Sequence, residues 1–155
     1  MKTAVVILNW NTKGFLEDFL PALISSVEKV DGAEVVVADN ASTDGSIELM
    51  AEKFPQVKTL SFEKNLGFTG GYNRAFKELC SCTEAPEYFL LINSDIEVPA
   101  GWLQPLVDWM DSHPDCGACA PKLHSWQEKE KFEYAGAAGG YLDKFGYPLC
   151  RRRVL

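Results

Sequence analysis

Residues 34–54 read EVVVADNASTDGSIELMAEKF, in which three consecutive valines lead to a carboxylate, a polar turn and a helical pattern. The apolar part is short and rich in β-branched side chains, which is typical of a strand covered on both faces. The helical pattern ends before Pro55, because the residue preceding a proline disfavours the helical conformation. If units of this kind repeat along the chain, they predict an α/β fold.

The same alternation of strand and helix recurs along the chain. Strands are predicted at 3–8, 34–39, 57–62 and 88–93, helices at 15–27, 47–54, 72–80 and 101–112, and a fifth strand at 116–120. Because such units pair in parallel through right-handed crossovers, we expect an open, mostly parallel α/β sheet flanked by helices. Pro21 should kink or interrupt the first helix, since it removes a backbone donor.

The pattern changes after residue 122. The charged segment WQEKEKFEY is followed by AGAAGGYLDKFGYP, which is more like a hairpin or flap than another strand–helix unit. We therefore expect an α/β domain at 1–122 and a flap- or hairpin-like extension at 123–155.

Composition narrows the class of protein. At 155 residues, with 46% hydrophobic and 24% charged residues, the chain is long enough for one core. The net charge of -7 argues against a nucleic-acid partner, because such surfaces need clustered basic residues. The odd number of cysteines and the absence of a secretory signal favour a reduced, cytoplasmic protein. We expect the cysteines to be small buried side chains and not metal or redox groups (Cys80, Cys82, Cys116, Cys119, Cys150).

Polar residues follow three of the predicted strands, at 9–11, 39–40 and 93–95. In parallel sheets ligands bind beyond the carboxyl ends of the strands, so these residues should share one edge. Asp39 follows its strand directly and is predicted to face a ligand and to be dispensable for packing. Asp44 lies where an acid would stabilise the start of the next helix, and a structural role is favoured there.

Two further features of the sequence are suited to binding a diphosphate. Asp95, beside Asn93 and Ser94, is a hard carboxylate suited to Mg²⁺ or Mn²⁺, and such a cation would let a diphosphate approach an acidic protein. The turn NLGFTGGYNR at 65–74 contains glycines that allow close backbone approach before a helix. It matches neither the Walker pattern nor a dinucleotide-binding GxGxxG.

Four segments together carry a family resemblance: VVILNWNT, VVVADNASTDGS, NLGFTGGYNRA and LLINSDIEVPAGWL. In this order and spacing they resemble the inverting family 2 glycosyltransferases with the GT-A fold, particularly the rhamnosyltransferase-like branch. The resemblance implies transfer of a sugar, with inversion, from a nucleotide-diphosphate sugar such as dTDP- or UDP-sugar to an acceptor hydroxyl. It further implies a saccharide or lipid-linked saccharide acceptor and a place in cell-surface polysaccharide synthesis, at the cytoplasmic side of a membrane.

The resemblance also implies roles for individual residues. Asp39 would accept hydrogen bonds from the base, and Asp95, at the family's DxD position, would hold Mn²⁺ or Mg²⁺. Asn93 departs from the stricter DxD form. The nucleotide-binding residues implied are Asn9, Trp10, Asn11, Asp39, Asn65, Gly67, Asn93 and Ser94.

The family's GGFDE and ED motifs, which supply the acceptor-side general base, do not follow the flap-like segment. We therefore expect a donor-binding portion that ends before the base and transfers sugar poorly by itself, with the catalytic residue unidentified. Two alternatives stay open: a nucleotide-binding fragment without catalysis, and a receiver-type signalling module that binds Mg²⁺. The sequence leaves the oligomeric state open.

Overall fold

The computed structural model describes residues 1–133 and 140–150. The chain divides into two compact units, Met1–Val107 and Asp108–Leu155. The boundary predicted after residue 122 separates a donor-binding part from a flap-like part by function and not by compactness, and it stays a prediction.

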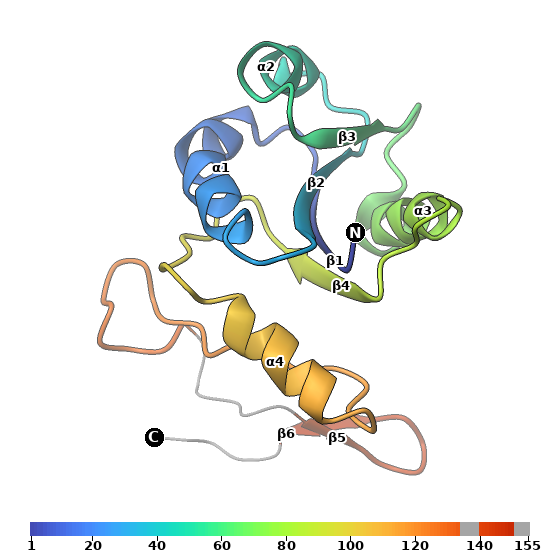
Figure 1. Ribbon diagram of the computed structural model, residues 1–155, viewed down its shortest axis with the longest axis vertical. Helices are drawn as coiled ribbons and strands as arrows, with labels where there is room; N and C mark the ends of the chain where they lie inside the picture. The colour runs from blue at the N-terminus through green and yellow to red at the C-terminus, as the bar shows by residue number, and fades with distance from the viewer. Residues whose placement is uncertain (134–139, 151–155) are drawn as a thin grey trace. The chain divides into compact units, whose positions relative to one another are not determined.

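A four-stranded parallel sheet forms the centre of the first unit (Figure 1). Its strands are β1 (Thr3–Asn9), β2 (Ala33–Asp39), β3 (Lys58–Ser61) and β4 (Tyr88–Ile92), in the order β3-β2-β1-β4. The central strands β1 and β2 are almost entirely buried, as their continuous apolar sequences predict. The open parallel α/β sheet expected from the sequence is thus confirmed.

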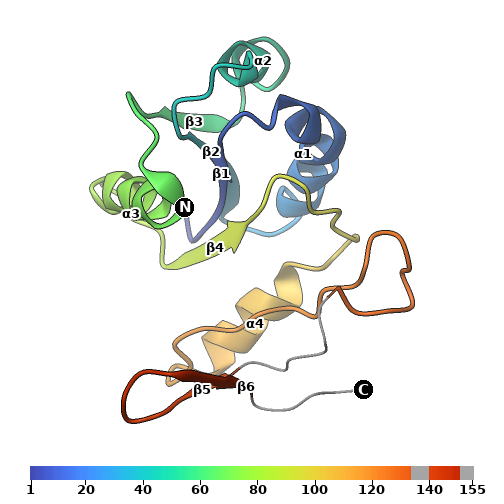
Figure 2. The same ribbon diagram turned by 180° about the vertical axis from the view of Figure 1, so that it is seen from behind.

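Helices cover both faces of this sheet, with α1 (Lys13–Val27) and α2 (Ser46–Lys53) on one side and α3 (Gly67–Cys80) on the other (Figures 1 and 2). Successive residues of a strand point to opposite faces, so β1 contributes to two cores. Val5 and Ile7 pack in the core on the α1 side, whereas Ala4 and Val6 pack on the α3 side. Helix α4 (Gln104–Ser112) follows β4 along the chain.

Pro21 does not interrupt α1, which is a continuous helix from Lys13 to Val27. Pro21 and Glu17, whose carbonyl loses its usual helical partner, both lie on the exposed side of the helix, where water can take that partner's place. The buried side of α1 is formed mainly by leucines and a valine (Leu16, Leu20, Leu23, Val27), and Phe15 is exposed.

In the second unit, β5 (Gly140–Leu142) and β6 (Pro148–Cys150) form an antiparallel hairpin. The prediction of a fifth strand at 116–120 is wrong. This segment is mostly exposed, and its glycine and alanines offer little side-chain surface to pack into a sheet. Residues 134–139 and 151–155, which include part of the predicted flap and the three arginines, lie outside the described residues.

The expectation that the cysteines are buried is wrong for those with described side chains. Cys80, Cys82 and Cys119 are exposed and Cys116 is half-buried, all as free thiols. Cys80 ends α3, and Cys116 and Cys119 belong to the uncovered 116–120 segment. Within the described residues, no helix combines the length and hydropathy needed to cross a membrane.

Candidate nucleotide-binding site

The carboxyl ends of β1, β2 and β4 define the edge at which the candidate site lies. Asn9 of β1 is paired with Asp39 of β2, and Ile7 of β1 with Ile92, the last residue of β4. The chain runs outward from β1 to β2 and β3, then returns to place β4 on the other side of β1. The β1–β4 junction is therefore the topological switch point, where ligands bind in open α/β sheets.

A buried hydrogen-bond network joins the ends of β1 and β2. Asn9 is 0% exposed and Asp39 is 2% exposed. The Asn9 Nδ2 donates to Asp39 Oδ1 at 2.7 Å and to Ser42 Oγ at 3.0 Å, while Asp39 Oδ2 accepts from the Ser42 backbone N–H at 2.9 Å. The Thr12 hydroxyl donates to Asn9 Oδ1. The expectation that Asp39 is dispensable for packing is wrong, because its carboxylate satisfies two donors in the interior.

The two loops that leave these strands are fastened to each other. Asn11 Oδ1 accepts from the Thr43 N–H at 2.7 Å, and the Asn11 N–H donates to Ser42 Oγ at 3.0 Å. Asn11 and Ala41 are the non-glycine residues with positive φ among those described, at 55° and 65°. Such conformations are held only where the surroundings enforce them, and they are enriched at ligand sites. Trp10 lies in the chain between the hydrogen-bonded residues Asn9 and Asn11, and its side chain is 54% exposed.

Asp44 has the structural role that the sequence favours, because it stabilises the start of a helix. It does so at two helices, whereas the sequence predicts only one. Its Oδ1 accepts from the Ser46 N–H at 3.0 Å at the start of α2, and its Oδ2 from the Lys13 N–H at 2.9 Å at the start of α1. Desolvation by neighbouring protein groups acts to raise the pKa of the exposed Asp44 carboxyl, but hydrogen bonds from Ser46 and Lys13 outweigh it and lower that pKa below its ordinary value.

The glycine-rich turn is held against β2 by Asn40, which is 2% exposed. The Asn40 Oδ1 accepts from the Leu66 N–H at 2.9 Å, and its Nδ2 donates to Asn65 Oδ1 at 2.9 Å and to the Gly67 carbonyl at 3.1 Å. Asn65 Oδ1 also accepts from the Gly67 N–H at 2.7 Å. The sequence places Asn40 at the site's edge but gives no signal of this role, since an asparagine after a strand usually only starts a turn.

Gly71 lies within α3, which begins at Gly67 and not at Tyr72 as predicted, so much of the predicted turn is helix. A Cβ at this position would lie 2.6 Å from the Leu8 Cδ1 atom and 3.2 Å from the Asn40 Nδ2 atom. Glycine thus lets α3 pack closely against the Leu8 and Asn40 side chains of β1 and of the loop after β2. Gly67 has a φ of +70°, which also favours glycine.

The segment 93–95 follows β4 on the other side of β1. Asn93 and Asp95 are exposed and Ser94 is half-buried. Among the described residues, no group of three metal-ligating side chains comes together. The protein side of a cation site at Asp95 is thus one accessible carboxylate with an amide neighbour, and this fits Mg²⁺ or Mn²⁺, which take one or two carboxylates together with substrate phosphates.

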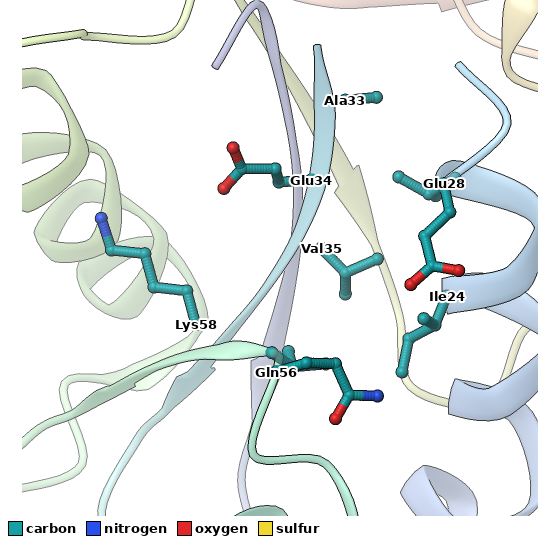
Figure 3. A pocket seen from close by; sticks show the side chains of 9 residues that line it. Ile24, Glu28, Ala33, Glu34, Val35, Gln56 and Lys58 are labelled. Carbon is teal, nitrogen blue, oxygen red and sulfur yellow. The ribbon is translucent and has the colours of Figure 1, made fainter. Parts of the chain in front are cut away.

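The structure therefore brings the predicted residues together in two connected groups and one separate turn. Asn9, Asn11 and Asp39 belong to the β1–β2 network, Asn65 and Gly67 are joined to β2 through Asn40, and 93–95 follows β4 at the same edge. A small hollow at the opposite edge contains none of them. It lies among α1 and the starts of β2 and β3, and Figure 3 shows Ile24 of α1 facing Val35 of β2, with Gln56 nearby.

Curated relatives indicate the chemistry of similar proteins. The chain is 28% identical over 125 residues to N-acetylglucosaminyl-diphospho-decaprenol L-rhamnosyltransferase of Mycobacterium tuberculosis, in two strains. The match covers 77% of this chain and 40% of the relative. The chain thus spans well under half the length of the curated relatives that it matches.

Solved structures share the fold. S. aureus TarS has a TM-score of 0.60 and 23% identity, covering 80% of this chain and 24% of that protein. Its 1–349 portion has been solved with UDP and with UDP-GlcNAc. The mannosyltransferase PcManGT of Pyrobaculum calidifontis, solved with GDP-Man and Mn²⁺, has a TM-score of 0.58 and 23% identity, covering 79% of this chain and 34% of that protein.

The family itself follows from the sequence match. The family model described as Glycosyl transferase family 2 matches residues 4–148, which is nearly the whole chain. That match shows that the chain is a member of glycosyl transferase family 2, and the chain has the GT-A fold of the solved glycosyltransferases.

Proposed function

We propose that this chain binds a nucleotide-diphosphate sugar at the carboxyl edge of β1, β2 and β4. The transferred sugar goes to an acceptor hydroxyl with inversion, in the synthesis of a cell-surface polysaccharide. The observation that carries the proposal is the arrangement of two fixed polar groups and one exposed carboxylate around the switch point of the sheet.

The nucleoside end of the donor is assigned to the β1–β2 side of the edge. Each Asp39 oxygen accepts one hydrogen bond within the protein, and a carboxylate oxygen has a second lone pair with which to accept from a base N–H. Trp10 is exposed beside this group and offers a ring face to the base or the ribose. The fastened loops hold both residues in place before the ligand arrives.

The diphosphate is assigned to the side of β4 and α3. Asp95, with Asn93 beside it, would hold the divalent cation there, and the glycine-rich turn at the start of α3 lets backbone approach the phosphates. The cation, when bound, offsets the charge of the diphosphate and stabilises it as a leaving group. The mannosyltransferase solved with GDP-Man and Mn²⁺ supports this assignment.

Inversion requires the acceptor oxygen to attack the anomeric carbon on the side opposite the departing diphosphate, while a general base removes the hydroxyl proton. We assign no base among the described residues. The acceptor is proposed to be a saccharide or a lipid-linked saccharide. The curated relatives are named for a diphospho-decaprenol acceptor, which supports the second. With a lipid-linked acceptor, the protein would work in the cytoplasm at a membrane surface.

The alternative of nucleotide binding without transfer has no observation that favours it over catalysis. The receiver-type alternative is wrong, because the chain belongs to a glycosyltransferase family and its strand order, β3-β2-β1-β4, differs from the 2-1-3-4-5 order of receiver domains.

A calorimetric screen of UDP, dTDP and GDP, each with and without MnCl₂, tests the proposal. We expect one base to be preferred and its affinity to rise when Mn²⁺ is added. Equal, metal-independent binding of all three, or binding of none, would contradict it. The preferred nucleotide then identifies which sugar donors to assay for transfer.

A further inference from the structure

Tyr72 connects α3 to the chain at the end of β4, just before residues 93–95, through the interior of the protein. It lies in α3, one residue after Gly71, and is 3% exposed. Its ring packs against Phe68 at a centroid distance of 5.0 Å and against Phe76 at 5.9 Å, within the core on the α3 side of the sheet. The ring is thus fixed by packing, and the direction of its hydroxyl is fixed with it.

The hydroxyl reaches the point at which β4 separates from β1. The Tyr72 O–H donates to the Ile92 carbonyl at 3.2 Å, and this hydrogen bond is buried. Ile92 is the last residue of β4 and the last to be paired with β1. Its carbonyl belongs to the peptide plane shared with Asn93, so the hydrogen bond sets the direction in which 93–95 leaves the sheet.

We propose that Tyr72 is a positioning residue for the cation and diphosphate site, acting through the Ile92–Asn93 peptide and not by contact with the ligand. This inference rests on the proposed function, because it assumes that Asp95 holds the cation. Asn93 and Asp95 are themselves exposed, so packing around their side chains does little to orient them. The buried hydrogen bond one peptide earlier orients the backbone from which they project.

The hydroxyl is suited to a permanent donor role. Burial raises the pKa of Tyr72, against an opposing effect of the Leu8 backbone, so the group keeps its proton throughout the neutral range. The donor is therefore present at any pH at which the protein would work.

The test compares Tyr72→Phe with Tyr88→Phe. The first variant keeps the packed ring and removes only the hydroxyl from the carboxyl end of β4, and the second makes the same chemical change at the amino end of that strand. The preferred nucleoside diphosphate is titrated at increasing MnCl₂, and amide hydrogen exchange is followed in the metal-free protein. We expect Tyr72→Phe to need about fivefold more Mn²⁺ for half-maximal enhancement, with binding in the absence of metal unchanged. Exchange should be faster at 93–95 in this variant alone.

The outcomes separate the two proposals. If the wild type binds no nucleoside diphosphate, the proposed function fails and this inference fails with it. If the wild type shows the Mn²⁺ enhancement and Tyr72→Phe shows the same Mn²⁺ dependence, only the positioning role is refuted. Equal losses with and without metal, together with faster exchange throughout β4, would mean that Tyr72 is merely structural and would also refute it.

Discussion

The two sides of the candidate site use polar residues in opposite ways. On the β1–β2 side, Asn9, Asp39 and Asn40 are almost completely buried, and their side chains are bonded to other parts of the protein. On the β4 side, Asn93 and Asp95 are exposed. Both kinds of residue follow a buried strand and look alike in the sequence. The difference teaches that the buried group also builds the frame of the site, so that changing it lowers stability, whereas the exposed group can meet the ligand without any structural role.

The largest effect is expected at Asp39. Asp39→Ala leaves the Asn9 amide and the Ser42 N–H without their buried acceptor, and each such loss costs about 1–3 kcal/mol. We expect the free energy of unfolding, measured by urea titration, to fall by about 3 kcal/mol. Nucleotide binding should weaken in the same variant.

Asp39→Asn is the matched control, since it keeps the shape and one acceptor oxygen. It should lose less stability than Asp39→Ala. If Asp39→Ala unfolds at the same urea concentration as the wild type, the β1–β2 network is not a frame and the contrast between the two sides disappears.

The next largest effect is expected at Gly71. Gly71→Ala places a methyl group 2.6 Å from a Leu8 methyl and 3.2 Å from the Asn40 amide, so the Leu8 side chain or α3 must shift. Overpacking of this kind typically costs about 1–3 kcal/mol. Thermal denaturation should show a lower Tm, and nucleotide affinity should fall because Asn40 also holds the glycine-rich turn.

Gly14→Ala offers a control of the same chemical kind. Gly14 also lies in a helix, and a Cβ there would meet nothing within 4 Å. Because alanine is the better helix former, this variant should be neutral or more stable by up to about 1 kcal/mol. A similar loss in both variants would place the cause in the helices and not in the approach of α3 to β1.

The sequence predicts the sheet well and the roles of the residues at its edge less well. The strands β1 and β2 are predicted by their continuous apolar runs. Parallel pairing predicts that the polar residues after them lie at the same edge of the sheet. Burial of Asp39 and Asn40 does not follow, because a polar residue after a strand is ordinarily exposed and the partners of these two are 3 to 30 residues away. The Tyr72 hydrogen bond is likewise invisible, since the pattern of α3 predicts only that its ring is in the core.

A smaller effect, and one that depends on pH, is expected at Asp44. Its folded-state pKa is lowered, so the carboxylate contributes stability above the pKa of the unfolded chain, and this contribution is lost as the pH falls through the folded-state value. Asp44→Asn should therefore narrow the difference in stability between pH 7 and the acid range below about pH 4. Urea titrations at several pH values measure this, and parallel curves for variant and wild type would contradict it. Asp44→Ala should cost about 1 kcal/mol at pH 7, because the Lys13 and Ser46 N–H groups at the starts of two helices lose their acceptor.

The smallest effect on stability, and the sharpest on binding, is expected at Asp95. The side chain is exposed and follows the end of β4, so Asp95→Ala should change the free energy of unfolding by no more than about 0.5 kcal/mol. The same variant should lose the Mn²⁺ enhancement of nucleotide binding, because it removes the carboxylate proposed to hold the cation. Titration of the preferred nucleoside diphosphate with and without MnCl₂ separates this result from a general loss, which would lower both affinities alike. Glu97→Ala serves as the control, since it removes a carboxylate of equal charge from an exposed position two residues further along. If Glu97→Ala abolishes the enhancement and Asp95→Ala does not, the cation belongs to Glu97, and the exposed side of the site must be reassigned.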